Sequence, residues 1–211
     1  ENQRSVQEAM KVKALALKWT ETFIKGDQAS EPREFDGLQV RCTGNQSISA
    51  GATAGGAALS LAMLDKLIDA VDDPMFLIMN KTMRRRLSAA ARLTSVGGYI
   101  TYALSEFGKR VMSYNDLPIL IADEDNEGNQ ILPFTETPTG GTATATSIYC
   151  VSLGDGKLMG LQNGGIDVRD IGELETKPCF RTRVEWYTGI ACFHGKSAAR
   201  LHSIGDLAVV A

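Results

Sequence analysis

The sequence is poor in three features that each mark a class of proteins. None of its 211 residues lies in a run approaching 18 consecutive apolar side chains, which excludes a membrane-spanning helix. Its 22 basic residues are outnumbered by 25 acidic ones, which excludes tight, phosphate-driven nucleic-acid binding by the isolated chain. Its cysteines are too sparse for a disulfide scaffold and lack metal-ligand spacing. We therefore expect reduced, buried or half-buried thiols at Cys42, Cys150, Cys179 and Cys192.

The sequence also begins without an initiator methionine and without a signal-like segment. Glu1 is the first residue, and the first twenty residues are amphipathic. We therefore expect a processed or trimmed product. The content of 44% hydrophobic and 22% charged residues is close to globular averages, which excludes a disordered or fibrous chain. A length of 211 residues predicts one domain, or one domain with a sizeable lobe.

Residues 1–25 have the periodicity of a long amphipathic helix. Its apolar side chains form two stripes, which predict neighbours on more than one side. One stripe holds Val6, Met10, Leu17 and Ile24, and the other holds Val12, Trp19 and Phe23. Residues 26–55, rich in Gly, Ser, Thr and Asn, predict a long irregular connection.

The remaining pattern predicts two helices and then a series of strands. A second helix is expected over 57–72, a short buried strand at Phe76–Met79, and a third helix from the N-cap Thr82 to about Leu93. Strands are expected near 98–102, 109–112, 118–121, 147–151, 158–161, 166–168, 181–187, 189–193 and 198–210. Alternation puts Val184 and Trp186 on an inward face, with Trp186 at the hydrophobic centre of the β-rich lobe. The fold class is α+β.

Two loops resemble binding motifs without completing them. Gly195-Lys196-Ser197 ends like a phosphate-binding loop, but Ile190 occupies the place of the first Walker glycine, and no helix clearly follows. A turn between strands is therefore the better prediction. Asp123, Asp125, Glu127 and Gly128 match the first half of a calcium loop, but Phe134 stands where the bidentate Glu should be. This segment predicts a solvated acidic turn.

Neither the Cys192–His194 pair nor the run of arginines at 84–86 predicts an active site. Cys192 and His194 share a strand face, but no third group orients them, and His202 could join them only through the fold. Arg84, Arg85 and Arg86 point in three directions on a helix, so they predict a solvated helix start or salt bridges to an adjoining subunit. We therefore predict no enzyme and no catalytic, cofactor-binding or metal-binding residues.

The order of several short segments is informative. Phe23–Asp27 is followed by Phe35–Leu38, and the helix–strand–helix series covers Leu61–Val71, Phe76–Asn80 and Thr82–Leu93. Strand segments then follow at Phe107–Val111, Leu117–Ile119, Ser147–Tyr149 with Gly154, and Arg183–Tyr187 with Gly189. This series resembles the major capsid proteins of tailed bacteriophages and prophages, the Hong Kong 97-type fold. The resemblance covers nearly the whole chain.

The resemblance implies a domain plan. Residues 1–56 would form the spine helix and the following loop of the P (peripheral) domain. Residues 57–146 would form the A (axial) domain, and residues 147–211 would form the returning strands of the P and A domains. The family's N-terminal arm and E-loop would be missing, because the chain starts at the spine helix. The family's cross-linking reaction needs an E-loop Lys and a partner Asn; no matching Asn lies near Glu173–Arg181, so no catalytic residue is transferred.

The resemblance also implies a function. The chain would be a structural shell subunit that assembles into hexameric and pentameric capsomers enclosing DNA, with scaffold, portal and packaged DNA as further partners and no membrane. It would reside in the virion capsid, and in the host cytoplasm during assembly.

Two other classes remain open. The alternative is an encapsulin-like bacterial nanocompartment shell protein, and the incomplete motifs disfavour a third class, a small hydrolase or nucleotide-binding enzyme. Complementary charges at Arg84–Arg86 and Asp123–Glu127 would support subunit association. Without the family's N-terminal arm and E-loop, the 211 residues alone should remain a monomer or small ring, whereas the full-length product should assemble.

Overall fold

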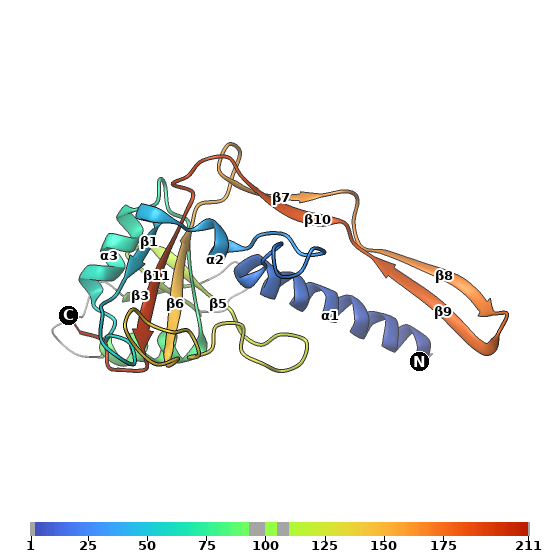
Figure 1. Ribbon diagram of the computed structural model, residues 1–211, viewed down its shortest axis with the longest axis horizontal. Coiled ribbons are helices and arrows are strands. Elements are labelled where there is room, and N and C mark those ends of the chain that lie inside the picture. Colours follow the sequence, from blue (N-terminus) through green and yellow to red (C-terminus); the bar gives the residue numbers. More distant parts are fainter. Residues whose placement is uncertain (1–2, 93–99, 105–109, 211) are drawn as a thin grey trace.

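The computed structural model describes residues 3–92, 100–104 and 110–210 of the chain. They form two parts that differ in shape (Figure 1). The sheet body contains a seven-stranded sheet with its covering helices. The arm contains the long helix α1 (Gln3–Lys25) and two successive two-stranded ribbons that run beside it. The structure is therefore a layered α+β body with a long projection.

The sheet of the body is mixed, in the order β1-β11-β6-β2-β5-β4-β3. Its strands are β1 (Ser47–Ser49), β11 (Ala198–Gly205), β6 (Ala145–Val151), β2 (Phe76–Met79), β5 (Leu117–Ile121), β4 (Arg110–Tyr114) and β3 (Ile100–Leu104). The pairs β1–β11 and β2–β5 are parallel, and the other neighbours are antiparallel. Every residue of the central strand β6 is buried, as expected for a strand covered on both faces.

Helices α3 (Leu61–Asp69) and α4 (Lys81–Ala90) cover one face of the sheet, where a cluster of buried side chains includes Leu64, Leu87 and Leu77. The N-cap of α4 is Asn80, one residue before the helix, and not the expected Thr82. Asn80 Oδ1 accepts a hydrogen bond from the Met83 amide at 2.7 Å, and its Nδ2 donates to the Leu132 carbonyl at 2.8 Å. This side chain satisfies a free helix amide and also ties the helix to the loop before β6.

The other face is covered by the end of α1, by α2 (Leu38–Arg41) and by the loop that contains Ile131 and Leu132. The expectation of an irregular segment over 26–55 is therefore only partly correct. This segment also contains η1 (Gly44–Gln46) and β1, in which Ile48 pairs with Leu201 and adds an edge strand to the sheet. Three residues are too few to show strand alternation in the sequence.

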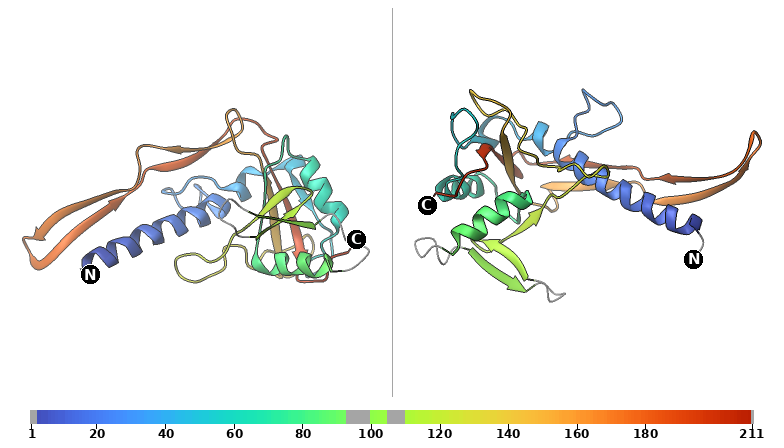
Figure 2. Two further views of the ribbon diagram at one scale, coloured as in Figure 1. Left: turned by 180° about the vertical axis from the view of Figure 1, so that it is seen from behind. Right: turned by 90° about the horizontal axis from the view of Figure 1, so that it is seen from below.

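The ribbons of the arm are β7 (Leu158–Gln162) with β10 (Thr188–Cys192), and β8 (Asp167–Leu174) with β9 (Lys177–Glu185). Both views in Figure 2 show the second ribbon extending alongside α1, away from the sheet body. The strands expected near 158–161, 166–168 and 189–193 are confirmed, although β8 is longer than predicted. The strand expected at 181–187 begins earlier, at Lys177, and ends at Glu185, before Trp186. The predicted last strand ends at Gly205. The strands expected at 98–102 and 109–112 are described only from Ile100 and from Arg110 onwards.

Candidate assembly surfaces

An aromatic junction joins helix α1 to the ribbons within the arm. Trp19 stacks on Phe23 with ring centroids 5.2 Å apart and lies 6.0 Å from Trp186. Its Nε1 donates to Thr188 Oγ1 at 3.1 Å, and that hydroxyl donates to the Leu161 carbonyl at 3.1 Å. Helix and ribbon are therefore held together by both ring packing and a short hydrogen-bond chain.

Trp186 corrects one expectation. It follows β9 and is half-buried against Trp19, whereas the sequence analysis placed it at the hydrophobic centre of a β-rich lobe. The ribbon has no second sheet to pack on, so helix α1 supplies the cover. The predicted direction of Val184 agrees with this arrangement, because Val184 lines a hollow that Arg4 and Glu8 border from the helix side.

Polar contacts hold the far part of the arm. Arg4 Nη2 donates to Thr182 Oγ1 at 2.8 Å and lies 2.5 Å from Asp170 Oδ1, and Thr182 donates to Glu8 Oε1 at 2.9 Å. The hydrogen bond from Arg4 lowers the pKa of the Asp170 carboxyl. The guanidinium also lies 5.6 Å from the centre of the Phe180 ring. Arg4 therefore connects α1 to both strands of the outer ribbon.

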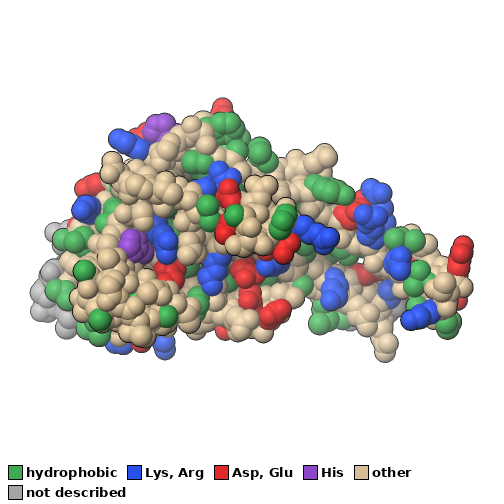
Figure 3. All heavy atoms as spheres, in the orientation of Figure 1, with side chains coloured by type: hydrophobic (Ala, Val, Ile, Leu, Met, Phe, Trp, Pro, Cys, Tyr) green, Lys and Arg blue, Asp and Glu red, His purple; other side chains and the backbone are tan. Residues whose placement is uncertain are grey.

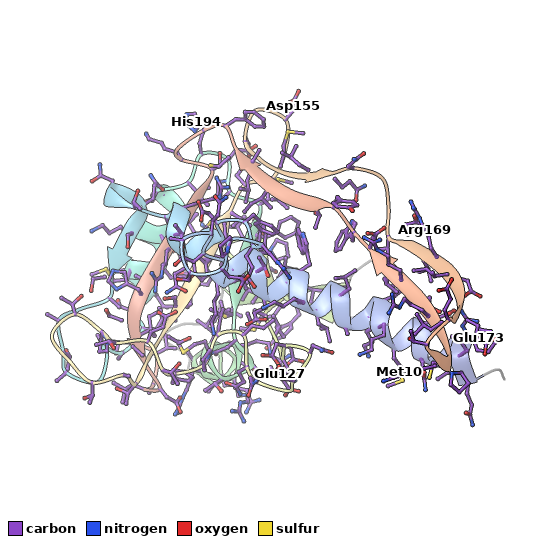
Figure 4. All side chains as sticks on the ribbon, turned by 45° about the vertical axis from the view of Figure 1, so that its right-hand side comes forward. Met10, Glu127, Asp155, Arg169, Glu173 and His194 are labelled. Carbon is purple, nitrogen blue, oxygen red and sulfur yellow. The ribbon has the colours of Figure 1, made fainter. Side chains whose placement is uncertain are left out.

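The arm presents apolar side chains to solvent. Met10 on α1 is 66% exposed, Phe180 on β9 is 68% exposed, and Tyr187 just before β10 is 62% exposed. The first apolar stripe of α1 is thus buried only at its end, where Ile24 is 1% exposed. Figure 3 shows hydrophobic, basic and acidic side chains interspersed over the arm, and Figure 4 shows Met10, Arg169 and Glu173 outside the sheet body. Such a surface is typical of a region that contacts another protein.

A second surface is a groove beside α4, which we call the arginine groove. It encloses a hollow of about 580 Å³. It is lined by Arg84, Arg85, Ser88, Ala89, Arg92, Tyr102, Val111, Met112, Ile119 and Ile121. The three consecutive arginines do diverge, since Arg86 Nε turns to Asp206 Oδ1 at 2.9 Å. Arg84 and Arg85 nevertheless share the groove with Arg92, which lies two residues after the end of α4 and was not expected there.

The acidic loop, residues 123–128, is an ordered turn at the surface. Asp125 Oδ1 accepts hydrogen bonds from the amides of Glu127 and Asn129, both at 2.8 Å. Lys81 Nζ lies 2.6 Å from Asp123 Oδ1. Phe134, which stands in the place of a calcium ligand, packs against the hydrophobic core. The loop is therefore organised by its own backbone, as predicted for a solvated acidic turn.

The other motifs lie in ordinary structural settings. Ala198 begins β11 directly after Gly195–Ser197, so a strand and not a helix follows the glycine-lysine-serine sequence. The Cys192 thiol donates to the His194 carbonyl at 3.2 Å, and the His194 ring accepts from the Lys196 amide at 3.3 Å. His202 Nδ1 lies 2.9 Å from Ser203 Oγ, so its nearest polar partner is that neighbour.

All four cysteines are free thiols, in agreement with the sequence analysis, but Cys179 is exposed on β9 and not buried as expected. Within residues 3–92, 100–104 and 110–210, no group of three or more His, Cys, Asp or Glu side chains could hold a metal ion. The described helices also include none that is long and apolar enough to cross a membrane.

Comparisons with known proteins identify the fold through structure alone. No family model matches the chain, and no curated protein matches it by sequence. The structure is similar to the holo-SrpI encapsulin complex from Synechococcus elongatus PCC 7942, with a TM-score of 0.73 and 16% identity over 100% of this chain and 69% of that one. It is also similar to the capsid of an empty GTA particle, with a TM-score of 0.62 and 14% identity over 95% of this chain and 66% of that one.

These similarities agree with the order of elements found here: a long helix, a body with a mixed sheet, and returning ribbons beside the helix. The chain spans about two thirds of the length of each of these shell proteins. At such low identity the likeness establishes the architecture, and it agrees with the family resemblance of the sequence. The protein has the Hong Kong 97-type capsid fold.

Proposed function

We propose that the chain is a structural subunit that assembles with copies of itself into a closed shell. The observation that carries this proposal is the exposed arm, a helix and two ribbons with open apolar side chains, on a fold shared with two shell proteins. An isolated two-stranded ribbon is marginally stable in water, so a contact that covers its open face would stabilise it. The role is structural and not enzymatic.

The first candidate is the major capsid protein of a tailed phage or prophage. In this proposal residues 1–56 form the spine helix and the following loop of the P domain, residues 57–146 form the A domain, and residues 147–211 contribute returning strands to both the P and A domains. Hexameric and pentameric capsomers of this subunit enclose DNA in the virion, after assembly in the host cytoplasm with a scaffold and a portal. The likeness to the GTA capsid supports this candidate.

The second candidate is an encapsulin-like nanocompartment shell protein. It is favoured by the encapsulin comparison, which covers 100% of the chain with a TM-score of 0.73. A hollow of about 450 Å³ at the aromatic junction is lined by aromatic rings and by charged side chains of both signs, among them Trp19, Phe35, Trp186, Lys18, Glu31, Arg33 and Glu34. This mixed lining has the chemistry to hold an amphipathic peptide of a cargo enzyme.

One experiment separates these candidates. The gene product that contains these residues is expressed, particles are collected by sedimentation, and they are inspected by electron microscopy. Closed shells are expected. Their contents then distinguish the candidates, because nuclease-protected DNA indicates the phage capsid and a co-purified enzyme indicates the nanocompartment. A product that remains monomeric under all conditions contradicts the proposal.

A further inference from the structure

We propose that the arginine groove of one subunit binds the acidic loop of a neighbouring copy. This inference rests on the proposed function and names one contact through which the subunits would associate. The two surfaces carry opposite charge, lie on the same chain and are both exposed, so each subunit offers both halves of the contact.

The cations of the groove have no ion-pair partner among the described residues. Arg84, Arg85 and Arg92 are all exposed, and no ion pair joins any of them to another described residue. Arg85 donates only to Thr82 Oγ1, at 3.2 Å. By contrast, the neighbouring Arg86 is paired with Asp206. The groove thus concentrates three guanidinium groups, which suit two-pronged hydrogen bonding to carboxylates.

The walls of the groove strengthen this attraction. Met112 and Ile119 belong to the hydrophobic core and form its floor, and Tyr102 forms the far wall, with its hydroxyl 3.2 Å from Ser88 Oγ. Apolar walls lower the local dielectric constant, so an ion pair formed here is stronger than one on an open surface.

The acidic loop has free carboxylates on a rigid frame. Asp123 is occupied by Lys81, and Asp125 holds the turn through the amides of Glu127 and Asn129. Glu124 and Glu127 are exposed and form no ion pair with any described residue. Because the turn is already ordered, little conformational entropy would be lost when its two free carboxylates bind.

The placement of the two surfaces suits a head-to-tail contact. The groove lies on the α4 side of the sheet, whose core includes Met112. The acidic loop begins two residues after Ile121 of the groove, and Lys81 at the start of α4 pairs with its Asp123. It then leads into Ile131 and Leu132, which belong to the buried cluster on the other face of the sheet, and it projects below α1 in Figure 1. Two different patches on one subunit make a heterologous contact, which closes into a ring when repeated by rotation.

An acidic protein loop is a better occupant than nucleic acid. The chain carries 25 acidic against 22 basic residues, and this negative balance disfavours tight binding driven by phosphate contacts. The groove is also partly apolar, which suits a folded loop docked against side chains.

Charge reversal tests the contact in the gene product that contains these residues. The groove variant is Arg84→Glu with Arg92→Glu, the loop variant is Glu124→Arg with Glu127→Arg, and a third protein combines all four changes. The control is Asp155→Lys with Lys196→Glu, which reverses two exposed charges in other loops. Circular dichroism checks folding, and Arg84→Gln with Arg92→Gln replaces any groove variant that does not fold.

The readout is the fraction of protein in particles, measured by sedimentation and light scattering. Each reversal alone should lower that fraction about tenfold or more, and the combined protein should recover to within about threefold of wild type. The inference is overturned if a folded groove variant assembles like wild type, if the combined protein fails to recover, or if the control loses assembly equally. Normal assembly with loss of DNA from the particles would instead assign the groove to nucleic acid. If the wild type itself forms no particles, the proposed function fails first.

Discussion

The central strand of the sheet body is buried, whereas the outer ribbon of the arm is exposed. Every residue of β6 is buried, but in β8 only Gly172 and Leu174 are even half-buried. The centre of the sheet is covered on both faces by helices and loops, while the outer ribbon is covered on one face by α1. The difference indicates that the free energy of folding comes mainly from the body. Within the arm, the aromatic junction and the contacts of Arg4 hold α1 to the ribbons, and the open surface of the arm is available for assembly.

The largest expected contrast between the two regions is in thiol reactivity. Burial raises the pKa of Cys150 to about 12, so this thiol remains protonated at neutral pH and inaccessible, whereas Cys179 is exposed on the arm. A disulfide reagent should label Cys179 at least about a thousandfold faster than Cys150, whose reaction requires unfolding. Mass spectrometry of a labelling time course measures both rates. Similar rates at the two sites would contradict the burial of β6.

Truncation of one leucine in each region compares their packing. Leu77 is fully buried in β2, so Leu77→Ala should lower the free energy of unfolding by about 2–5 kcal/mol. Leu161 on β7 is 51% exposed, so Leu161→Ala should change it by less than about 0.5 kcal/mol in the unassembled chain. Urea unfolding followed by circular dichroism gives both values. Equal losses would show that the arm shares the stability of the body.

Ion pairs in the two regions should also differ. Arg200 and Glu136 are joined at 2.8 Å in the body with 15% of each side chain exposed, so Arg200→Ala should cost about 3 kcal/mol by leaving Glu136 unpaired. Arg169 on the arm is 67% exposed beside Asp167, and Arg169→Ala should cost less than about 1 kcal/mol. The same urea series measures both. A loss at Arg169 as large as that at Arg200 would contradict the comparison.

The aromatic junction within the arm, between α1 and the ribbons, should show a measurable coupling. A double-mutant cycle with Trp19→Ala and Trp186→Ala isolates the contact of the two rings, which lie 6.0 Å apart. The expected coupling free energy is about 0.5–1.5 kcal/mol. Tyr187→Ala, which removes a 62% exposed ring next to the junction, should couple weakly to Trp19→Ala and provides the control. If the stability losses of Trp19→Ala and Trp186→Ala are simply additive, the contact of the two rings does not hold α1 to the ribbon.

The smallest effect is expected from the tie between Arg4 and Asp170. The pKa of the Asp170 carboxyl is lower in the folded protein than in the unfolded chain, where it is near 3.9. The stability that this ion pair contributes is therefore fully present above about pH 3.9. It is lost as the pH falls through the lower pKa of the folded state. Asp170→Asn should loosen the outer ribbon and remove this pH dependence while leaving the unfolding of the body unchanged. Hydrogen exchange of the β8 and β9 amides reports the local effect. Unchanged protection in the variant would argue against the tie.

Local features of the fold were predictable, and contacts between distant segments were not. The alternation that places Val184 toward a neighbour is a property of any strand, but the sequence does not say that this neighbour is α1. Asn80 and Thr82 both suit an N-cap, and only the tertiary contact with Leu132 distinguishes them. The spacing of Arg84 and Arg92 was visible in the sequence.

The sequence did not show that these arginines line a groove, because the other side of the groove is formed by Tyr102 and Met112 from the hairpin of β3 and β4. The sequence resemblance thus supplied the fold, while the assembly surfaces required the structure. Surfaces formed by several elements depend on long-range packing, which a local pattern does not encode.

A cryo-electron microscopy map of particles formed by the gene product tests the central claim most directly. The account predicts a closed shell in which each subunit has this fold and a neighbouring subunit covers the open face of its arm, including Met10 and Phe180. Absence of any particle would contradict the claim, as would a particle in which the arms remain exposed to solvent.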